Sequence, residues 1–320
     1  MVLSGLVIAY AAERDGNLKT YTFNRLSRIY TVLVPALLLT LAFDALGATI
    51  RMDAHSPDYY QSHPLGAFLF RGLTLSIEWT GVAEPVRLGT NAALWSLSYE
   101  MAYYAIFGIA LFLSGPLRII LILIVALLVG LPVLALMPTW LIGVFIWRRI
   151  RSGAYLPRAQ ALILGIAAPV AIVLAKIAGL HDLFTALTLQ GFASLGAIPY
   201  LGYSDEMLWN TVLAVLIALH LFGIASLFRT AEINPRSRTI RAIRWTAGGS
   251  FSLYVVHFPV LHLLNAALPK SLPLYDLWLL GLTLAICFGF AALFERPLKT
   301  YRVILRRLWP ASHRRVPADA

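Results

Sequence analysis

Long apolar runs separated by shorter polar segments dominate the sequence. The clear runs cover residues 29–46, 92–113, 161–180, 207–228, 251–268 and 275–294. Their lengths are close to the roughly 20 residues with which an α-helix crosses a bilayer. The regular alternation of apolar and polar positions that marks membrane strands is absent from them. The pattern therefore predicts an all-α fold, a polytopic transmembrane helix bundle.

Two segments leave alternative assignments of the spans open. Residues 65–79 are interrupted by charged residues, so they either span the membrane or lie re-entrant at the interface. Residues 117–147 form either one long kinked helix or two segments broken at Pro132 and Pro138. In one assignment, each of the two segments spans the membrane once. In the other, residues 65–79 do not span and residues 117–147 span twice. Both assignments give the same total number of spans. We expect about eight complete spans, plus a partial helix over residues 1–12.

Composition supports a membrane protein with one domain. Of the 320 residues, 59% are hydrophobic and only 13% are charged, and the mean hydropathy is +0.76. A soluble domain carries about a quarter charged residues. No internal repeat or soluble domain interrupts the pattern. We therefore expect a single transmembrane domain over residues 1–310 and a basic polar tail over residues 311–320.

The basic residues lie between the apolar runs. They cluster in residues 14–28, 148–158 and 229–244 and again after residue 295, and the formal net charge is +11. This distribution is typical of cytoplasmic loops that follow the positive-inside rule and contact anionic lipid head groups. It predicts a multi-pass protein of the inner membrane whose basic surfaces face membrane lipid, and it argues against nucleic acid as a partner.

A polar group at the edge of an apolar run gives the first candidate site. Residues 91–108, NAALWSLSYEMAYYAIFG, carry Ser96 and Glu100, which share one helix face because they are four residues apart. A carboxylate at membrane depth is costly and is by default a functional-site hypothesis. An interfacial glutamate at a helix start, flanked by the belt aromatics Trp95 and Tyr99, explains the pattern equally well.

Two further positions carry potential chemistry. Arg25 and Arg28 are three apart at a predicted cytoplasmic helix entrance, where they either bind the phosphates of a nucleotide-bearing donor or serve as ordinary juxtamembrane arginines. His257 lies inside an apolar run, where a histidine faces a cavity, relays protons or bonds to a neighbouring helix. The single cysteine, Cys287, and the five-residue spacing of His257 and His262 predict no metal site.

Five short motifs occur in order along the chain. They are MVLSGLVIA at residues 1–9, Arg25-x-x-Arg28, the WSLSxE motif of Trp95–Glu100, the SxxLYxxHxP motif that ends at Pro259, and Glu295-Arg296-Pro297. In content and order they resemble the motifs of the acyltransferase 3 family, bacterial integral-membrane acyltransferases that modify sugars and polysaccharides. The resemblance covers nearly the whole chain.

The resemblance implies transfer of an acyl group, most often acetyl from acetyl-CoA, to a hydroxyl of a sugar, polysaccharide or glycolipid. Arg25 and Arg28 would hold the phosphates of acyl-CoA, which is a donor substrate and not a permanently bound cofactor. Ser96, Glu100 and His257 would form the catalytic set in the membrane-embedded site. The alternative is a non-enzymatic membrane protein, either a glycan or lipid transporter or an inactive acyltransferase remnant. The paired, matching broken helices of many transporters are not evident here.

One departure from the family affects the expected activity. Family members resemble a ten-helix bundle whose first helix carries a histidine that acts as base or acyl relay. In this sequence the VLSG helix is already under way at residue 1, and none of the seven histidines occupies that position. A hydroxyl acceptor needs a base. We therefore expect either a start codon placed too late or a truncated chain without measurable acyl transfer.

Overall fold

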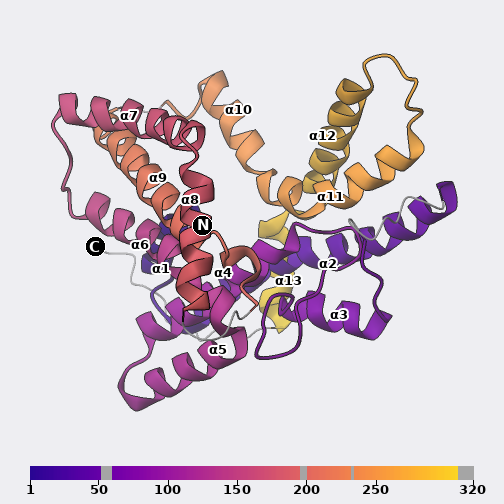
Figure 1. Ribbon diagram of the computed structural model, residues 1–320, viewed down its shortest axis with the longest axis horizontal. Helices are drawn as coiled ribbons and strands as arrows, with labels where there is room; N and C mark the ends of the chain where they lie inside the picture. The colour runs from indigo at the N-terminus through magenta and orange to yellow at the C-terminus, as the bar shows by residue number, and fades with distance from the viewer. Residues whose placement is uncertain (52–59, 195–199, 232–233, 309–320) are drawn as a thin grey trace. The chain divides into compact units, whose positions relative to one another are not determined.

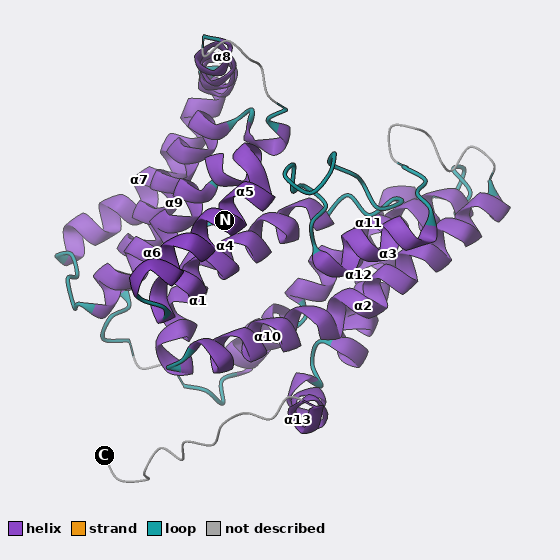
Figure 2. Cartoon of the chain, turned by 90° about the horizontal axis from the view of Figure 1, so that it is seen from below, coloured by secondary structure: helices purple, strands orange, loops and turns teal. Residues whose placement is uncertain are grey.

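The computed structural model describes residues 1–51, 60–194, 200–231 and 234–308. These residues form helices joined by loops and contain no strand (Figures 1 and 2). Six of the helical segments are long and apolar enough to cross a membrane. The predicted all-α, polytopic helix bundle is therefore confirmed. The predicted tail at residues 311–320 lies outside the described residues.

The chain forms two compact units. The first unit comprises Met1–Arg14, Glu78–Pro85 and Leu97–Ile233, and the second comprises Asp15–Ile77, Val86–Ser96 and Asn234–Ala320. The first holds α1 (Val2–Asp15, except its last residue), α5 (Gly115–Ala135), α6 (Met137–Arg151), α7 (Arg158–Ile177), α8 (Leu180–Ala193), the 3-10 turn Gly202–Ser204 and α9 (Met207–Leu227). The second holds α2 (Leu18–Ile50), α3 (Leu65–Thr74), α10 (Arg238–Ala247), α11 (Ser250–Ala267), α12 (Tyr275–Phe294) and α13 (Leu298–Leu308). Helix α4 (Leu94–Phe112) begins in the second unit and continues in the first.

The spanning candidates are α2, α5, α7, α9, α11 and the stretch that contains α12. Helix α6 has 15 residues and is about 22 Å long, which is shorter than the hydrocarbon core of a bilayer of about 30 Å. Helix α4 has 19 residues and is long enough, but with its serine, tyrosine and glutamate residues it is not among the six candidates. The total of eight spans stays a prediction.

Both ambiguous segments have a defined structure. Residues 117–147 hold two helices, α5 and α6, which are separated at Leu136, and α5 itself is broken where the backbone is non-helical at Gly130 (φ 77°). The other segment forms only the ten-residue α3, which ends where Leu75 adopts the left-handed conformation. The alternatives of one long kinked helix, and of a helical span over residues 65–79, are therefore wrong.

Two polar regions are more helical than the sequence pattern indicates. Residues 13–28 were predicted to form a loop, but α1 reaches Asp15 and α2 begins at Leu18, so the turn is confined to Gly16 and Asn17. Gly16 has φ +70°, and the Asn17 side chain caps α2 by accepting from the N–H of Thr20 at 2.8 Å. The region after residue 295 contains the helix α13.

Within the first unit, glycines allow two helix backbones to touch. A Cβ atom on Gly5 of α1 would lie 2.1 Å from the carbonyl oxygen of Trp140 on α6. A Cβ atom on Gly143 of α6 would lie 2.0 Å from the carbonyl oxygen of Val2. Small residues at helix contacts are typical of membrane bundles, where dispersion contacts replace the hydrophobic effect.

Four of the described helices contain a proline in their interior, which leaves a carbonyl group without its usual donor because proline has no N–H. Pro35 of α2 is one of them, and for the other three the replacement donor comes from another segment. In the first unit, Pro132 frees the Leu128 carbonyl and Pro169 frees the Gly165 carbonyl. In the second unit, Pro259 frees the Val255 carbonyl. The replacement donors are the backbone N–H of Gly81 to Leu128 (3.1 Å), the Nδ1 of His220 on α9 to Gly165 (2.8 Å), and the Nδ2 of Asn91 to Val255 (3.0 Å).

The α7–α9 contact shows how such a bond holds two helices together. The two helices run side by side in both views (Figures 1 and 2). Gly223 of α9 lies so close to α7 that a Cβ atom would come within 2.8 Å of the Ala161 carbonyl oxygen. The bond from His220 to the Gly165 carbonyl therefore crosses a contact in which the helices already touch.

The positive-inside pattern predicts that residues 229–244 lie in the cytoplasm. With Cys287→Ala as background, a cysteine placed at Ser237 should not react with a membrane-impermeant maleimide in intact cells, but should react after permeabilisation. A cysteine placed at Gln190 is the control and should react in intact cells. The apolar runs 161–180 and 207–228 each separate it from a basic cluster by one expected span, which places it on the opposite side of the membrane. Strong labelling at Ser237 in intact cells would overturn the orientation.

The Asn91–Val255 bond can be tested by a double-mutant cycle. Asn91→Ala should lower the free energy of unfolding by about 1–3 kcal/mol, because a buried carbonyl loses its donor. Pro259→Ala restores an N–H that can reach the Val255 carbonyl, so Asn91→Ala should cost less in that background. Thermal stability of the purified protein is the measurement. Asn210→Ala is the control, since the Asn210 side chain bonds to no described residue. Equal losses in both backgrounds would contradict the assignment.

Candidate functional site

In the second unit, α4 and α11 are joined through Ser96 and Tyr254. The Tyr254 hydroxyl donates to the carbonyl of Ala93 at 2.9 Å and lies 2.5 Å from Ser96 Oγ. A tyrosine hydroxyl has one hydrogen and a carbonyl only accepts. The Ser96 hydroxyl therefore donates to Tyr254, and the lone pairs of Ser96 Oγ remain able to accept a hydrogen bond. The two motifs that contain these residues thus meet in one unit.

His257 is held by its own helix. Its Nδ1 lies 2.7 Å from the Tyr254 carbonyl and 3.2 Å from the Leu253 carbonyl. Because both oxygens only accept, Nδ1 carries a hydrogen, and in the neutral ring Nε2 bears a lone pair. No described residue bonds to Nε2. The ring also packs against Phe258, with centroids 4.4 Å apart. His257 can therefore accept a proton or a hydrogen bond through Nε2.

The segment that leads into α4 is anchored on α2. The carboxylate of Asp44, which is 7% exposed, accepts from the N–H of Thr90 at 3.2 Å and from its hydroxyl at 2.5 Å. Gly89 has φ +59°, and a Cβ atom there would lie 1.9 Å from the Asp44 carboxylate. Asn91 donates to Thr40 of α2 at 3.0 Å as well as to Val255. These bonds fix the backbone just before Ser96.

Glu295 stabilises the start of the helix that carries His257. Its carboxylate accepts from the backbone N–H of Ser252, in the first turn of α11, at 2.8 Å. A negative charge at a helix N-terminus is favourable because the first N–H groups lack partners there. The next residue, Arg296, lies over the Trp245 ring with its guanidinium carbon 4.0 Å from the centroid. The Glu295-Arg296-Pro297 motif thus positions α11.

In the first unit, Glu100 accepts the last hydrogen bond of a side-chain network. Tyr104 donates to the Glu100 carboxylate at 2.6 Å, and Tyr104 lies 3.0 Å from the Ser4 hydroxyl. The Trp140 indole N–H donates to Ser4 at 3.2 Å. We assign Ser4 as donor to Tyr104, because the single hydrogen of Tyr104 is used on Glu100. No cationic side chain of the described residues pairs with Glu100.

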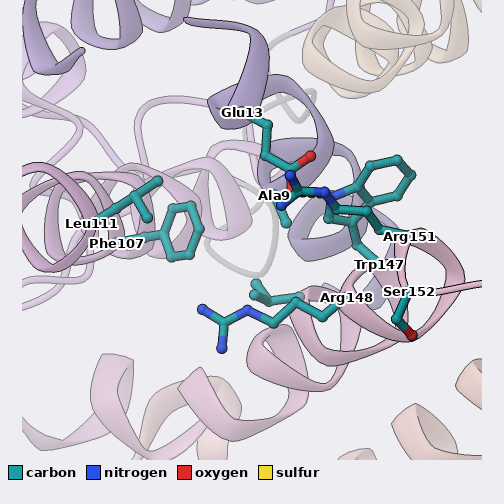
Figure 3. Close-up of a pocket in the computed structure, with 9 residues that line it drawn as sticks. Ala9, Glu13, Phe107, Leu111, Trp147, Arg148, Arg151 and Ser152 are labelled. Carbon is teal, nitrogen blue, oxygen red and sulfur yellow. Dashed lines mark hydrogen bonds and ion pairs between the residues drawn. The ribbon is translucent and has the colours of Figure 1, made fainter. Parts of the chain in front are cut away.

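A pocket of about 470 Å³ lies in the same unit (Figure 3). Glu13 accepts from the Trp147 indole N–H at 3.0 Å and from Arg151 at 2.9 Å, whereas Arg148 makes no recorded bond to a described residue. This volume is within the range of about 300–1,000 Å³ for small-molecule pockets. The lining residues are Ala9 and Glu13 of α1, Phe107 and Leu111 of α4, and Val144, Trp147, Arg148, Arg151 and Ser152.

The Glu100 network and the pocket occupy the same face of α4. Glu100, Tyr104, Phe107 and Leu111 follow the spacing of one helix stripe. From Glu100 to Phe107 the distance along the helix axis is about 10 Å. A ligand in the pocket with an apolar part and an anionic group can contact apolar walls and the Arg148 guanidinium.

The two predicted donor arginines lie on α2 in different environments. Arg25 pairs with Asp15 at 2.8 Å, and the two side chains are only 11% and 9% exposed. Asn24 also donates to the other Asp15 oxygen at 2.6 Å, so both carboxylate oxygens are used. Arg28 is exposed. Arg25 is therefore also a structural residue, and Arg28 is the more accessible cation.

Outside the spanning candidates, one histidine lies between two carboxylates. His181 of α8 lies 2.8 Å from Asp182 and 2.9 Å from Glu206. Hydrogen bonding to Glu206 and to Asp182 raises the pKa of His181 above its usual value. Within the described part of the chain, no group of three or more His, Cys, Asp or Glu residues is arranged to hold a metal ion.

Sequence reasoning singled out Ser96, Glu100 and His257 but missed the residues that hold them. Tyr254 and Asn91 lie in stretches that the sequence analysis singled out, but nothing in the sequence indicated the hydrogen bonds that they make. Tyr104 shares the i, i+4 face of α4 with Glu100, and this spacing could have indicated the pair. The Ser4–Trp140 contact joins residues 136 positions apart and has no local signal.

The chain was compared with known proteins. The family model Acyl_transf_3, described as an acyltransferase domain, matches residues 1–292. No curated protein and no solved structure matches the chain. The match includes Ser96, Glu100, His257 and both arginines of α2. With more than nine-tenths of its length matched, the chain belongs to the acyltransferase 3 family.

Proposed function

We propose that this multi-pass membrane acyltransferase moves an acetyl group from acetyl-CoA to a hydroxyl of a cell-envelope sugar, polysaccharide or glycolipid, in the inner membrane of a bacterium. The thioester carbon–sulfur bond breaks and an ester carbon–oxygen bond forms. The acceptor hydroxyl loses a proton, and the departing thiolate gains one. The reaction therefore needs a base near the acceptor and cations for the donor phosphates.

The observation that carries this proposal is the state of Glu100. It is a carboxylate on an apolar helix, it accepts from Tyr104 at 2.6 Å, and no described cation neutralises it. A purely structural carboxylate in a membrane helix is normally paired with a positive charge. In the proposed reaction Glu100 orients the acceptor hydroxyl or takes its proton. In the second unit, Ser96 Oγ and His257 Nε2 are separate candidates for accepting a hydrogen bond.

On the donor side, Arg28 is the exposed cation of the Arg25-x-x-Arg28 motif, and Arg25 stands one helix turn before it. A guanidinium group binds phosphate through two parallel N–H donors. Arg28 thus supplies direct contacts to the donor. Arg25, paired with Asp15, supports the same surface and adds to its positive potential.

Arg28→Gln should weaken acetyl-CoA binding by about tenfold or more, because a charge-assisted contact is worth roughly 1.5–3 kcal/mol. Expression and thermal stability should stay the same, since Arg28 is exposed. Binding to the detergent-purified protein by calorimetry is the measurement. Arg149→Gln, at another exposed arginine predicted to face the cytoplasm, is the control. An unchanged affinity of Arg28→Gln for acetyl-CoA would contradict the donor-binding role and identify Arg28 as an ordinary juxtamembrane arginine.

The test uses the chain extended upstream by a histidine-bearing helix, since the resemblance implies that such a helix supplies the base. In that background Glu100→Gln should lower acetyl transfer by about 10²-fold or more if Glu100 acts on the acceptor proton. Tyr104→Phe, which removes the donor to Glu100, should give a smaller loss in the same direction. The assay follows labelled acetyl from acetyl-CoA into envelope glycan in isolated membranes, with acetyl-CoA binding measured in parallel and expected to persist.

The control for this test is Asp276→Asn, an exposed carboxylate in the first turn of α12. Its loss removes only a helix-dipole contribution of about 0.3–1 kcal/mol and should leave transfer unchanged. Near-wild-type transfer by Glu100→Gln would contradict the assigned role. His257→Gln would then be the next variant, since His257 Nε2 is the other available proton acceptor.

A further inference from the structure

Helix α13 lies beyond residues 1–292, the part of the chain that the family model matches. It packs on α2 within the second unit. Arg302 of α13 donates through Nε to Ser27 Oγ at 2.9 Å and through a terminal nitrogen to the Asn24 carbonyl at 2.8 Å. Ser27 lies between Arg25 and Arg28 in the sequence, and Asn24 directly precedes Arg25. The contact therefore brings an additional arginine to the Arg25-x-x-Arg28 motif.

Arg306 follows Arg302 by one helix turn and faces the same way. Its guanidinium carbon lies 5.9 Å from the centroid of the Phe23 ring on α2. Arg302 is within electrostatic reach of Arg25, Arg28 and Arg306. We call these four residues the arginine cluster. They come from two helices that are far apart in sequence, since Arg302 contacts residues 275 and 278 positions before it.

The charges of the arginine cluster are not balanced by its recorded ion pairs. Asp15 pairs with Arg25, and its second oxygen is used by Asn24. This leaves about three positive charges close together, and Arg302 is half-buried. Like charges that are partly removed from water repel each other unless an anion binds between them.

The arginine cluster also has unused donors. Arg302 uses its Nε–H and one terminal N–H on α2, and a guanidinium group has five N–H donors in all. The Nε atom of Arg25 is buried and has no hydrogen-bond partner in the described structure. Unused donors and uncompensated charge on one surface are the features of a site for a polyanion.

We propose that Arg302 and Arg306 complete the donor site, so that the phosphates of acyl-CoA bind to a surface formed jointly by α2 and α13. This inference rests on the proposed acyl-CoA donor. A CoA molecule carries a diphosphate and a 3′-phosphate, which together match about three uncompensated positive charges. A phospholipid head group has the same phosphate chemistry but usually supplies a single phosphate, so it balances the cluster less completely.

The test measures binding of CoA, and of 3′-dephospho-CoA, to the full chain in nanodiscs of phosphatidylcholine. Arg302→Gln should weaken CoA binding by about tenfold, and the more exposed Arg306→Gln by about threefold. Arg302→Lys should retain most of the affinity, because it keeps the charge. The wild-type chain should bind CoA more tightly than 3′-dephospho-CoA, and this difference in affinity should be smaller for Arg302→Gln.

Arg307→Gln is the matched control, since it removes the same charge from α13 but lies on another face of the helix and should leave CoA affinity unchanged. Ser27→Ala removes one bond that holds Arg302 while keeping all four charges. A small effect of Ser27→Ala beside a large effect of Arg302→Gln would support a role in binding. Equal losses in Ser27→Ala, Arg302→Gln and Arg302→Lys would show that Arg302 only fastens α13 to α2, which overturns the inference.

The remaining outcomes separate this inference from the proposed function. If Arg28→Gln weakens CoA binding while Arg302→Gln and Arg306→Gln do not, the inference fails and the proposed donor stands. If none of these variants changes CoA binding, both fail. If the variants affect only binding of phosphatidylglycerol added to the nanodiscs, the cluster is a lipid site and the inference is overturned.

Discussion

A membrane interior offers no water to a backbone carbonyl that has lost its donor, so a donor from elsewhere in the chain stabilises a spanning helix that contains a proline. The carbonyls of Leu128, Gly165 and Val255 are all matched in this way, each by a segment outside its own helix. For Val255 the donor is Asn91, 164 residues away. These bonds fix which segments are neighbours within each unit. The positions of the polar residues near the bonds follow from that pairing of segments.

The family motifs in the second unit mainly hold one another in place. Asn91 donates a hydrogen bond to the carbonyl that Pro259 frees, and Tyr254 accepts a hydrogen bond from the Ser96 hydroxyl. Glu295 caps the helix that carries His257. A motif residue can thus be essential without touching a substrate. The groups left with unused lone pairs, at Ser96 and His257, are those that remain available for chemistry.

The apolar runs predicted the helices well, because a spanning helix must be apolar over most of its length. The sequence could not tell whether residues 117–147 were one helix or two, since Pro132 permits both and the break depends on the contact of Gly81 with the Leu128 carbonyl. Helix α13 lies in the basic stretch after residue 295, where its arginines obscure the apolar positions that would have indicated a helix. Glu100 and His257 were visible as rare polar residues, but Tyr104 was not, since tyrosine is common at membrane interfaces.

The bond from His220 to the Gly165 carbonyl also fixes what the rest of the histidine ring can do. A carbonyl oxygen only accepts, so Nδ1 of His220 carries the hydrogen and, in the neutral ring, Nε2 bears a lone pair. The side chain that satisfies the carbonyl freed by Pro169 therefore presents an acceptor on its other nitrogen. One residue both closes the α7–α9 contact and leaves an acceptor beside it, which an aliphatic side chain of similar size could not do.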